Sequence, residues 1–352
     1  MVESLPPWLN AALQRLLTQR GHAWLLTGAA GLGQFDLSMA LAASWLCERP
    51  VGRGSLQATA CGHCEACFMI KAKSHPDLMV LLPETLALTQ GWPLDQKTQE
   101  ELDDKKRKPS KQIKMEAVQS LINFVQRTDA RGKGLVVVIY PAERMNNVSS
   151  SALLKSLEEP AGHTRFVLAT EDSVALLPTI RSRCQSFVLT RPSDDLAVAW
   201  LIQHGGMSER DATIWLKAAG GQPQTALALG QALVETSAWA EFPKLVAKGV
   251  QPSELPAALV ETPAVLVGAL HKLCHDWLCM VQGSQPRFFE RDVLQSALPQ
   301  LMQEESRQSA TYKLTMWSKA LNAQVRSAEH TLHAALMMEA LLSQAKQAVA
   351  YK

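Results

Sequence analysis

A strand, a glycine-rich turn and a helix follow one another near the start of the chain, and this order constrains the fold most. Residues 22–28 (HAWLLTG) form an apolar run typical of a buried strand, and residues 33–47 have apolar side chains at helical spacing. Between them, residues 28–33 read GAAGLG, with Gly28 and Gly33 in the frame G-x-x-x-x-G-K-[ST] of a phosphate-binding loop. Backbone N–H groups and a helix N-terminus attract phosphate in such a loop.

The loop lacks the two side chains that normally follow it. Gln34 and Phe35 stand where the frame has Lys and Ser or Thr. The lysine reaches the β- and γ-phosphates and the hydroxyl ligates magnesium, whereas glutamine carries no charge and phenylalanine cannot ligate a metal. We therefore expect a vestigial loop of Gly28, Gly31 and Gly33 that does not hydrolyse ATP, with weak nucleotide docking left open. A plain glycine turn between a strand and a helix is the structural alternative.

Further apolar runs alternate with helical patterns over the first part of the chain. Residues 134–140 (GLVVVIY) are continuously apolar, as in a strand covered on both faces. The other predicted strands are 77–83, 165–171 and 185–189, and the predicted intervening helices are 111–126 and 149–160. Strands that alternate with helices predict a parallel α/β sheet with helices on both faces.

After residue 193 the pattern becomes helical throughout. Breaks at residues 220–223, 251–254 and 283–286 separate successive helical segments. We predict an α/β domain over residues 1–190, a small helical domain over 191–232, and a larger all-α domain over 233–352.

A second missing group lies at the end of the strand predicted over residues 134–140. In phosphate-loop ATPases a strand of this kind ends in an acidic residue that helps to hold magnesium. Here Pro141 follows Tyr140 at that position, and Glu143 lies two residues further on. Two independent positions that carry ATP chemistry, the end of the loop and the end of this strand, thus lack their usual side chains.

Four cysteines predict a metal site in a module over residues 47–75. Cys61, Cys64 and Cys67 are spaced by two residues, and Cys47 offers a fourth thiolate from the end of the preceding helix. Four thiolates form a closed tetrahedral zinc site, which is structural rather than catalytic. An iron–sulfur cluster is the rival, but the fourth cysteine followed by proline of ferredoxin runs does not follow here. His63 and His75 rank below Cys47 as ligands.

Residues 179–187 (TIRSRCQSF) contain a candidate catalytic arginine. Ser182, Arg183 and Cys184 lie between the last two predicted strands. An arginine in this position could stabilise the transition state of ATP hydrolysis in a neighbouring subunit, as an arginine finger does. A surface arginine paired with a carboxylate is the alternative, and the local sequence by itself favours it.

Composition bounds the remaining options. With 47% hydrophobic residues, 19% charged residues and a net charge of +2, the chain is typical of a soluble globular protein and argues neither for nor against nucleic acid. We see no signal peptide and no apolar stretch long enough to span a bilayer, and we expect a cytosolic protein.

Two clusters of chemically active side chains favour ordinary structural roles. The charged segment 95–111 contains KKRK, but five acidic residues precede it, so we favour a solvated loop over a DNA contact. The cluster of His271, Cys274, His275 and Cys279 lies on one predicted helix, and its side chains cannot all converge on one ion. We expect it to be part of the helical packing.

Taken in order, these motifs resemble the AAA+ clamp-loader family of bacterial replicative DNA polymerase, and within it the delta-prime type of subunit. The resemblance rests on HAWLLTGAAGLGQ, the four-cysteine module, SSALLKSLEEP, FVLATED and TIRSRCQSF. It covers residues 1 to about 232 well, and the C-terminal part agrees mainly in position, length and helical character.

The resemblance implies a RecA-like AAA+ domain with an inserted zinc module, a helical lid and a collar domain within a ring of five subunits. Delta-prime subunits depart from the motor subunits at the loop and at the strand end, as this chain does at Gln34, Phe35 and Pro141. It also implies that Arg183 acts on ATP bound by the adjacent motor subunit. A lid arginine that senses ATP falls at Gln224, and the segment 95–111 departs from the family pattern.

Three functional hypotheses follow. The first is a non-catalytic clamp-loader subunit that contacts ATPase subunits, a delta subunit, the sliding clamp and primer–template DNA within a complex, without a membrane. The second is an AAA+ ATPase motor in which Glu143 does the metal work. The third is a zinc-dependent nucleic-acid-binding module on an inert scaffold.

Overall fold

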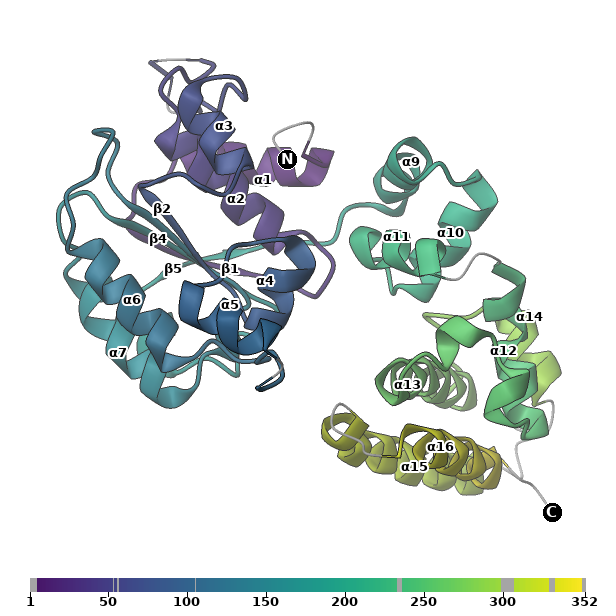
Figure 1. Cartoon of the computed structure of the whole chain (residues 1–352). Helices are drawn as coiled ribbons and strands as arrows, with labels where there is room; N and C mark the ends of the chain where they lie inside the picture. Colours follow the sequence, from purple (N-terminus) through teal and green to yellow (C-terminus); the bar gives the residue numbers. More distant parts are fainter. Residues whose placement is uncertain are drawn as a thin grey trace. The chain divides into compact units, whose positions relative to one another are not determined.

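The computed structural model describes residues 5–52, 54–55, 57–104, 106–232, 236–298, 307–328 and 333–349. The chain divides into two compact units, Met1–Pro192 and Ser193–Lys352 (Figure 1). The predicted boundary between residues 232 and 233 lies outside the described residues, since residues 233–235 are not described. The lid and collar domains therefore stay predictions.

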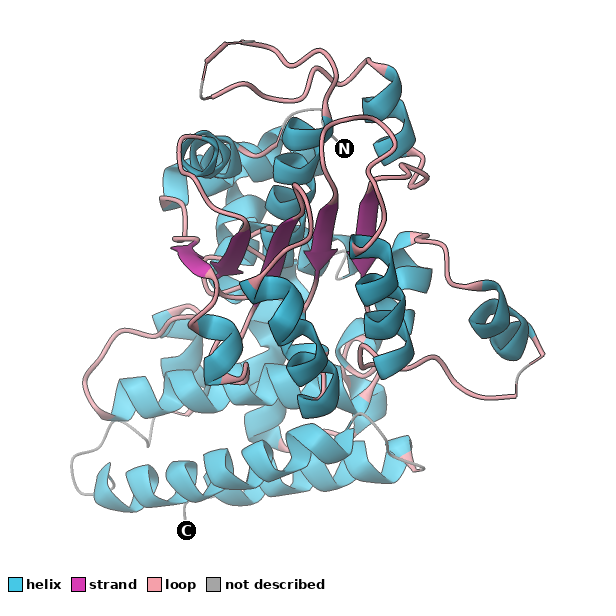
Figure 2. Cartoon of the chain, turned by 90° about the vertical axis from the view of Figure 1, so that its left-hand side faces the viewer, coloured by secondary structure: helices cyan, strands magenta, loops and turns pink. Residues whose placement is uncertain are grey.

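The first unit is built on a parallel five-stranded sheet with strand order β2-β3-β4-β1-β5. Figure 2 shows the strands side by side with their arrows in one direction. β1 pairs in register with β4 on one side and with β5 on the other. The strands are β1 Ala23–Thr27, β2 Leu78–Leu81, β3 Val136–Ile139, β4 Arg165–Thr170 and β5 Gln185–Val188.

Helices cover both faces of this sheet, as the sequence predicts. Alternate strand residues point to opposite faces, so Leu26 and Val138 pack under α1 and α2, whereas Leu25 and Val137 pack under α6, α7 and α8. Both faces are apolar, which explains the continuous apolar runs. The helices of this unit are α1 Pro7–Leu17, α2 Gln34–Leu46, α3 Glu65–Lys71, α4 Glu84–Gln90, α5 Gln96–Asp103, α6 Met115–Val125, α7 Asn147–Glu158 and α8 Pro178–Arg181, with a short 3₁₀ turn at Ala142–Arg144.

The charged segment 95–111 differs from the predicted solvated loop. Residues Gln96–Asp103 form α5, and the Asp95 side chain caps this helix by accepting a hydrogen bond from the Thr98 backbone N–H at 3.0 Å. No residue of α5 is buried. The prediction was wrong because helix capping and the high helix propensity of Gln, Glu and Lys compensate for the lack of an apolar face.

The second unit is helical in all of its described elements. α9, α10 and α11 pack on one another, and α13 packs against α15 and α16. The helices are α9 Asp194–Gly205, α10 Glu209–Ala218, α11 Pro223–Ala232, α12 Thr236–Lys248, α13 Pro263–Val281, α14 Arg291–Ala297, α15 Arg307–Ala328 and α16 Ala334–Val349, with 3₁₀ turns at Pro252–Glu254 and Ala257–Leu259.

The expectation that no apolar stretch could span a bilayer needs a correction at α13. This helix has 19 residues, and an 18-residue window within it has a mean hydropathy of 1.3, so it is long and apolar enough to cross a membrane by length and composition alone. Its packing against α15 and α16 is that of a core helix, since Leu270, Leu273 and Trp277 are fully buried. It also carries a fully buried aspartate, Asp276.

Asp276 holds the chain that follows α13. Its Oδ1 accepts a hydrogen bond from the Arg287 backbone N–H at 2.9 Å, and its Oδ2 accepts from those of Phe288 and Phe289 at 2.7 and 2.8 Å. The Phe289 ring stacks on Trp239 of α12, with 4.5 Å between ring centroids. One carboxylate therefore fixes the turn that carries an aromatic ring into the core.

We predict that Asp276→Asn destabilises the second unit by about 2–3 kcal/mol, because an amide NH₂ would face a buried backbone N–H. The melting temperature should fall by about 5–10 °C, as measured by calorimetry. Asp292→Asn, at an exposed position in α14, is the matched control and should leave the melting temperature unchanged. Equal melting temperatures for the two variants would show that the carboxylate is not needed.

Candidate functional site

The glycine loop connects β1 to α2 at the carboxyl edge of the sheet. Gly31 and Gly33 adopt left-handed backbone angles, with φ of 73° and 97°, which side chains other than glycine rarely tolerate. A Cβ atom on Gly28 would lie 3.1 Å from the Leu189 Cβ atom, so this position requires a close backbone approach. All three glycines thus stand where a side chain would be strained or crowded.

Gln34 does not project into the loop as a free side chain. Its exposed fraction is 1%, and its Nε2 donates hydrogen bonds to the carbonyl oxygens of Gly28 at 2.7 Å and Ala29 at 2.8 Å. The Trp8 indole N–H donates to the carbonyl oxygen of Leu32 at 3.0 Å. The loop is therefore fastened by hydrogen bonds from its own neighbours.

Phe35 belongs to a small aromatic cluster. Its ring centroid lies 5.3 Å from that of Tyr140 and 6.4 Å from that of Trp92, the latter in an edge-to-face arrangement. Burial and nearby carboxylates raise the pKa of Tyr140, so its hydroxyl stays protonated and donates to Glu171 Oε1 at 2.7 Å. Aromatic rings occupy the side of the loop where a metal-binding hydroxyl would stand in the intact motif.

The structure brings the two altered positions together. Tyr140 follows β3 and Phe35 is the second residue of α2, and parallel strands end at the same edge of a sheet. Glu143, the predicted substitute for the lost metal ligand, accepts a hydrogen bond from the Glu171 backbone N–H at 3.1 Å through Oε1. Its other oxygen, Oε2, is buried without a hydrogen-bond partner among the described residues. The first residue of α2 is Gln34, so no cationic side chain stands at that position to bind phosphate.

The four predicted cysteine ligands form one cluster. All four Sγ atoms lie within 4.8 Å of one another, and the distances from Cys47 to Cys61, Cys64 and Cys67 are 3.5, 3.8 and 3.8 Å. Four sulfurs at Zn–S distances near 2.3 Å in a tetrahedron are about 3.8 Å apart. The geometry thus fits one tetrahedral ion.

The protonation of the cluster is uneven. Burial raises the pKa values of Cys47 and Cys67. Burial acts in the same direction on Cys64, but backbone N–H groups and neighbouring thiols stabilise its thiolate and lower its pKa to about 6. His63 bonds through Nδ1 to the Cys61 carbonyl at 2.8 Å, and His75 Nδ1 accepts from the Asp77 N–H at 3.1 Å. Neither histidine joins the cluster.

Ion pairs fasten the cysteine module to the sheet. Arg131 Nη2 lies 2.6 Å from Glu65 Oε2 of α3, and its Nε donates to Glu48 Oε1 at 2.8 Å. The buried Asp77 carboxylate accepts from the backbone N–H groups of Ala130 and Arg131 at 2.7 and 3.0 Å. A loop preceding β3 is thereby tied to both ends of the module.

Arg183 follows α8 and is ion-paired in this chain. Its Nη2 lies 2.5 Å from Glu158 Oε1 at the end of α7, and its Nη1 donates to the Thr179 carbonyl at 2.9 Å. The Ser182 hydroxyl donates to the same carbonyl at 3.1 Å. Cys184 is a core residue, and burial raises its pKa to about 12. Only Arg183 of this triplet therefore offers a charged group near the surface.

Arg183 lies at the amino-terminal ends of the strands, and the glycine loop lies at their carboxyl-terminal ends. Arg183 comes just before β5, whose first residue Gln185 pairs with Trp24 at the start of β1, whereas the loop follows Thr27 at the end of β1. A strand of this length separates the two edges by roughly 13–17 Å. Arg183 is therefore too far from the loop of its own chain to act there.

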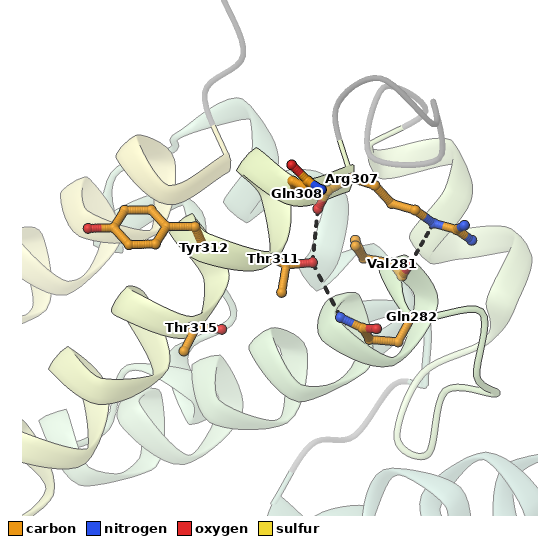
Figure 3. Close-up of a pocket in the computed structure, with 7 residues that line it drawn as sticks. All are labelled: Val281, Gln282, Arg307, Gln308, Thr311, Tyr312 and Thr315. Atoms are coloured by element: carbon orange, nitrogen blue, oxygen red, sulfur yellow. Dashed lines mark hydrogen bonds between the residues drawn. The ribbon is translucent and has the colours of Figure 1, made fainter.

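A separate cavity of about 580 Å³ lies in the second unit between the end of α13 and the start of α15 (Figure 3). The Gln282 amide donates to Thr311 Oγ1 at 3.3 Å, and Arg307 Nε donates to the Val281 carbonyl at 2.8 Å. Tyr312 extends away from these residues. We assign no chemistry to this cavity.

The sequence did not indicate three contact partners of the predicted site residues. Glu158 is the partner of Arg183, and Trp92 and Tyr140 complete the aromatic cluster around Phe35. Glu158 lies within SSALLKSLEEP, but nothing in that motif indicates which carboxylate faces α8. Gln224, at the position where the family resemblance implies a sensing arginine, lies in the first turn of α11 in the second unit.

Comparisons with known proteins agree with these features. A family model described as DNA polymerase III, delta subunit, matches residues 9–193. DNA polymerase III subunit delta′ of Pseudomonas aeruginosa is 34% identical over 279 residues, which are 78% of this chain and 74% of that protein. The Escherichia coli subunit of the same name is 33% identical over 230 residues, 64% of this chain and 60% of that protein.

A solved DNA polymerase III gamma-subunit-related protein of Thermotoga maritima covers 97% of this chain and 100% of its own length, at 16% identity and a TM-score of 0.44. That score is too low to support an argument. The sequence matches are sufficient on their own: the chain belongs to the delta-prime subunit family of DNA polymerase III.

Proposed function

We propose that this chain is a non-catalytic clamp-loader subunit of a cytoplasmic DNA polymerase III holoenzyme. In this proposal it assembles with ATPase subunits and a delta subunit into a hetero-pentamer that loads the sliding clamp on primed DNA. The AAA+ domain carries the zinc module at residues 47–75, a lid spans 191–232, and a collar spans 233–352. Contacts with the clamp and with primer–template DNA are made through the complex.

The observation that carries the proposal is the separation of Arg183 from the altered loop. An arginine at the amino-terminal ends of the strands can contact ATP only if that ATP is bound by another subunit. The loop of this chain has Gln34 in place of the lysine whose charge would hold a nucleotide. The ion pair with Glu158 is a weak restraint, because the glutamate side chain is 52% exposed. Bidentate bonds to a γ-phosphate are stronger than such a pair.

For Arg183→Ala we expect normal assembly with the ATPase subunits but ATP hydrolysis slowed by roughly 10³-fold at the adjacent site, because the transition-state charge loses its stabilising guanidinium. The measurement is single-turnover hydrolysis in the reconstituted complex.

Arg181→Ala is the matched control, since Arg181 is an exposed arginine at the end of α8, close by in the chain. An undiminished rate in the Arg183 variant would return this residue to a structural ion pair, whereas equal losses in both variants would indicate a damaged interface.

The rival proposal is an ATPase motor with an atypical loop, in which Glu143 holds the metal. We expect the purified chain to show no ATP turnover, because neither Gln34 nor Phe35 can replace a lysine and a metal ligand. Glu143→Gln distinguishes the proposals: turnover by the parent chain that this substitution abolishes would favour the motor.

We further propose that Cys47, Cys61, Cys64 and Cys67 bind one structural Zn²⁺. The four sulfur distances fit a closed tetrahedral site without an open position for a substrate. Zinc would join the C-terminal end of α2 to the start of α3, and so hold a segment with few secondary-structure bonds of its own.

The purified chain should contain about one zinc ion, and Cys64→Ser should reduce it to near zero and lower the melting temperature, because three ligands hold zinc poorly. Metal analysis by mass spectrometry measures the first effect and calorimetry the second. His63→Ala is the control and should keep its zinc. Full zinc content in Cys64→Ser would rule out the four-thiolate site.

The remaining alternative is that the module binds nucleic acid through its zinc. That hypothesis predicts that a chelator abolishes DNA binding while assembly persists. Our proposal attributes DNA binding to the complex and predicts that chelation weakens stability first.

A further inference from the structure

The polar segment after β2 has no role in the proposed function, yet its apolar residues pack against the core on the α1 and α2 face of the sheet. Leu86, Trp92 and Leu94 lie against the core cluster that contains Leu32 and Phe35. The three contacting side chains come from α4 and from the turn between α4 and α5. This segment is therefore packed on the first unit beside Phe35 rather than standing free of it.

Trp92 makes the most direct of these contacts. Its ring meets the ring of Phe35 edge to face, with 6.4 Å between centroids. Its backbone N–H donates to the Ala87 carbonyl at 2.8 Å, and Lys73 Nζ lies 5.6 Å over the indole ring. The indole ring of Trp92 thus contacts both Lys73 and Phe35, and Phe35 stands where the intact motif has its magnesium ligand.

Glu84 closes the segment at its base. This carboxylate is 8% exposed, yet it pairs with Arg107 through both oxygens at 2.5 and 3.0 Å and with Lys114 Nζ at 2.8 Å. It also accepts the Ser110 backbone N–H at 2.8 Å. Glu84 begins α4 and its partners lie at the far end of the segment, so the two ends are joined.

The hydrogen bonds of this clasp lower the pKa of the Glu84 carboxyl group. Burial by itself raises the pKa of a carboxyl group, but hydrogen bonds from Arg107, Lys114 and the Ser110 N–H outweigh it and lower the pKa of Glu84 to about 2. Arg107 makes a further bond to Glu101 of α5 at 2.8 Å. The clasp therefore stays ionised at any ordinary pH and also fixes α5.

We propose that residues 84–104 and 106–111 form a built-in cover that keeps the former nucleotide loop closed, with Trp92 as its contact and Glu84 as its clasp. The loop is then inactive for two separate reasons. It lacks the lysine and the metal ligand of the intact motif, and Trp92 of the same chain packs on Phe35, which stands in place of that metal ligand. The cover acts within the first unit and does not depend on the role of Arg183.

Hydrogen exchange of the intact chain tests the cover without using ATP hydrolysis. Glu84→Gln keeps the shape of the side chain but removes the charge, and Trp92→Ala removes the contact. Both should speed amide exchange in residues 28–36 by at least about tenfold and leave β4 unchanged. Glu100→Gln, exposed on α5 and outside the clasp, is the control and should change nothing. Faster exchange confined to residues 84–111 would overturn the proposal.

Binding of Mg·ATP, measured by titration calorimetry, provides a second test. A chain with Gln34→Lys alone, which keeps Phe35 and its contact with Trp92, should bind Mg·ATP weakly while the clasp holds, and adding Glu84→Gln should tighten binding by at least about tenfold. The cover is wrong if the Gln34→Lys chain already binds as tightly as the chain that carries both substitutions.

Discussion

The parallel pairing of β1 with β4 on one side and β5 on the other sets the positions on which the whole arrangement depends. Because the strands run in one direction, every loop after a strand lies at one edge and every segment before a strand lies at the other. The glycine loop, Tyr140 and Glu143 gather at the carboxyl edge, and Arg183 lies at the amino edge. A subunit with this sheet presents a nucleotide loop and an arginine in opposite directions.

The same frame explains how the loop is held without the lysine and hydroxyl side chains of the intact motif. A buried lysine with no phosphate would be an unpaired charge in the core, which is costly. Gln34 avoids that cost by bonding to two loop carbonyls, and Phe35 adds apolar packing with Tyr140 and Trp92. These replacements stabilise the connection between β1 and α2 through contacts within the chain.

The elements that were predictable from the sequence are those fixed by local pattern. Strands β1 to β5 followed from apolar runs, and the cysteine cluster from spacing, because both signals lie within short stretches. The partner of Arg183 and the contact of Trp92 with Phe35 were not predictable, since each joins segments distant in the sequence. The helix α5 was missed for a different reason: it has no apolar face, and capping by Asp95 rather than burial defines it.

The most direct test of the central claim is a structure of the assembled complex with a non-hydrolysable ATP analogue. Our account predicts that Arg183 has left Glu158 and lies within hydrogen-bond distance, about 3 Å, of the γ-phosphate on the neighbouring subunit, while residues 28–34 hold no nucleotide. Nucleotide bound in that loop, or Arg183 still paired with Glu158 while another arginine contacts the γ-phosphate, would contradict it.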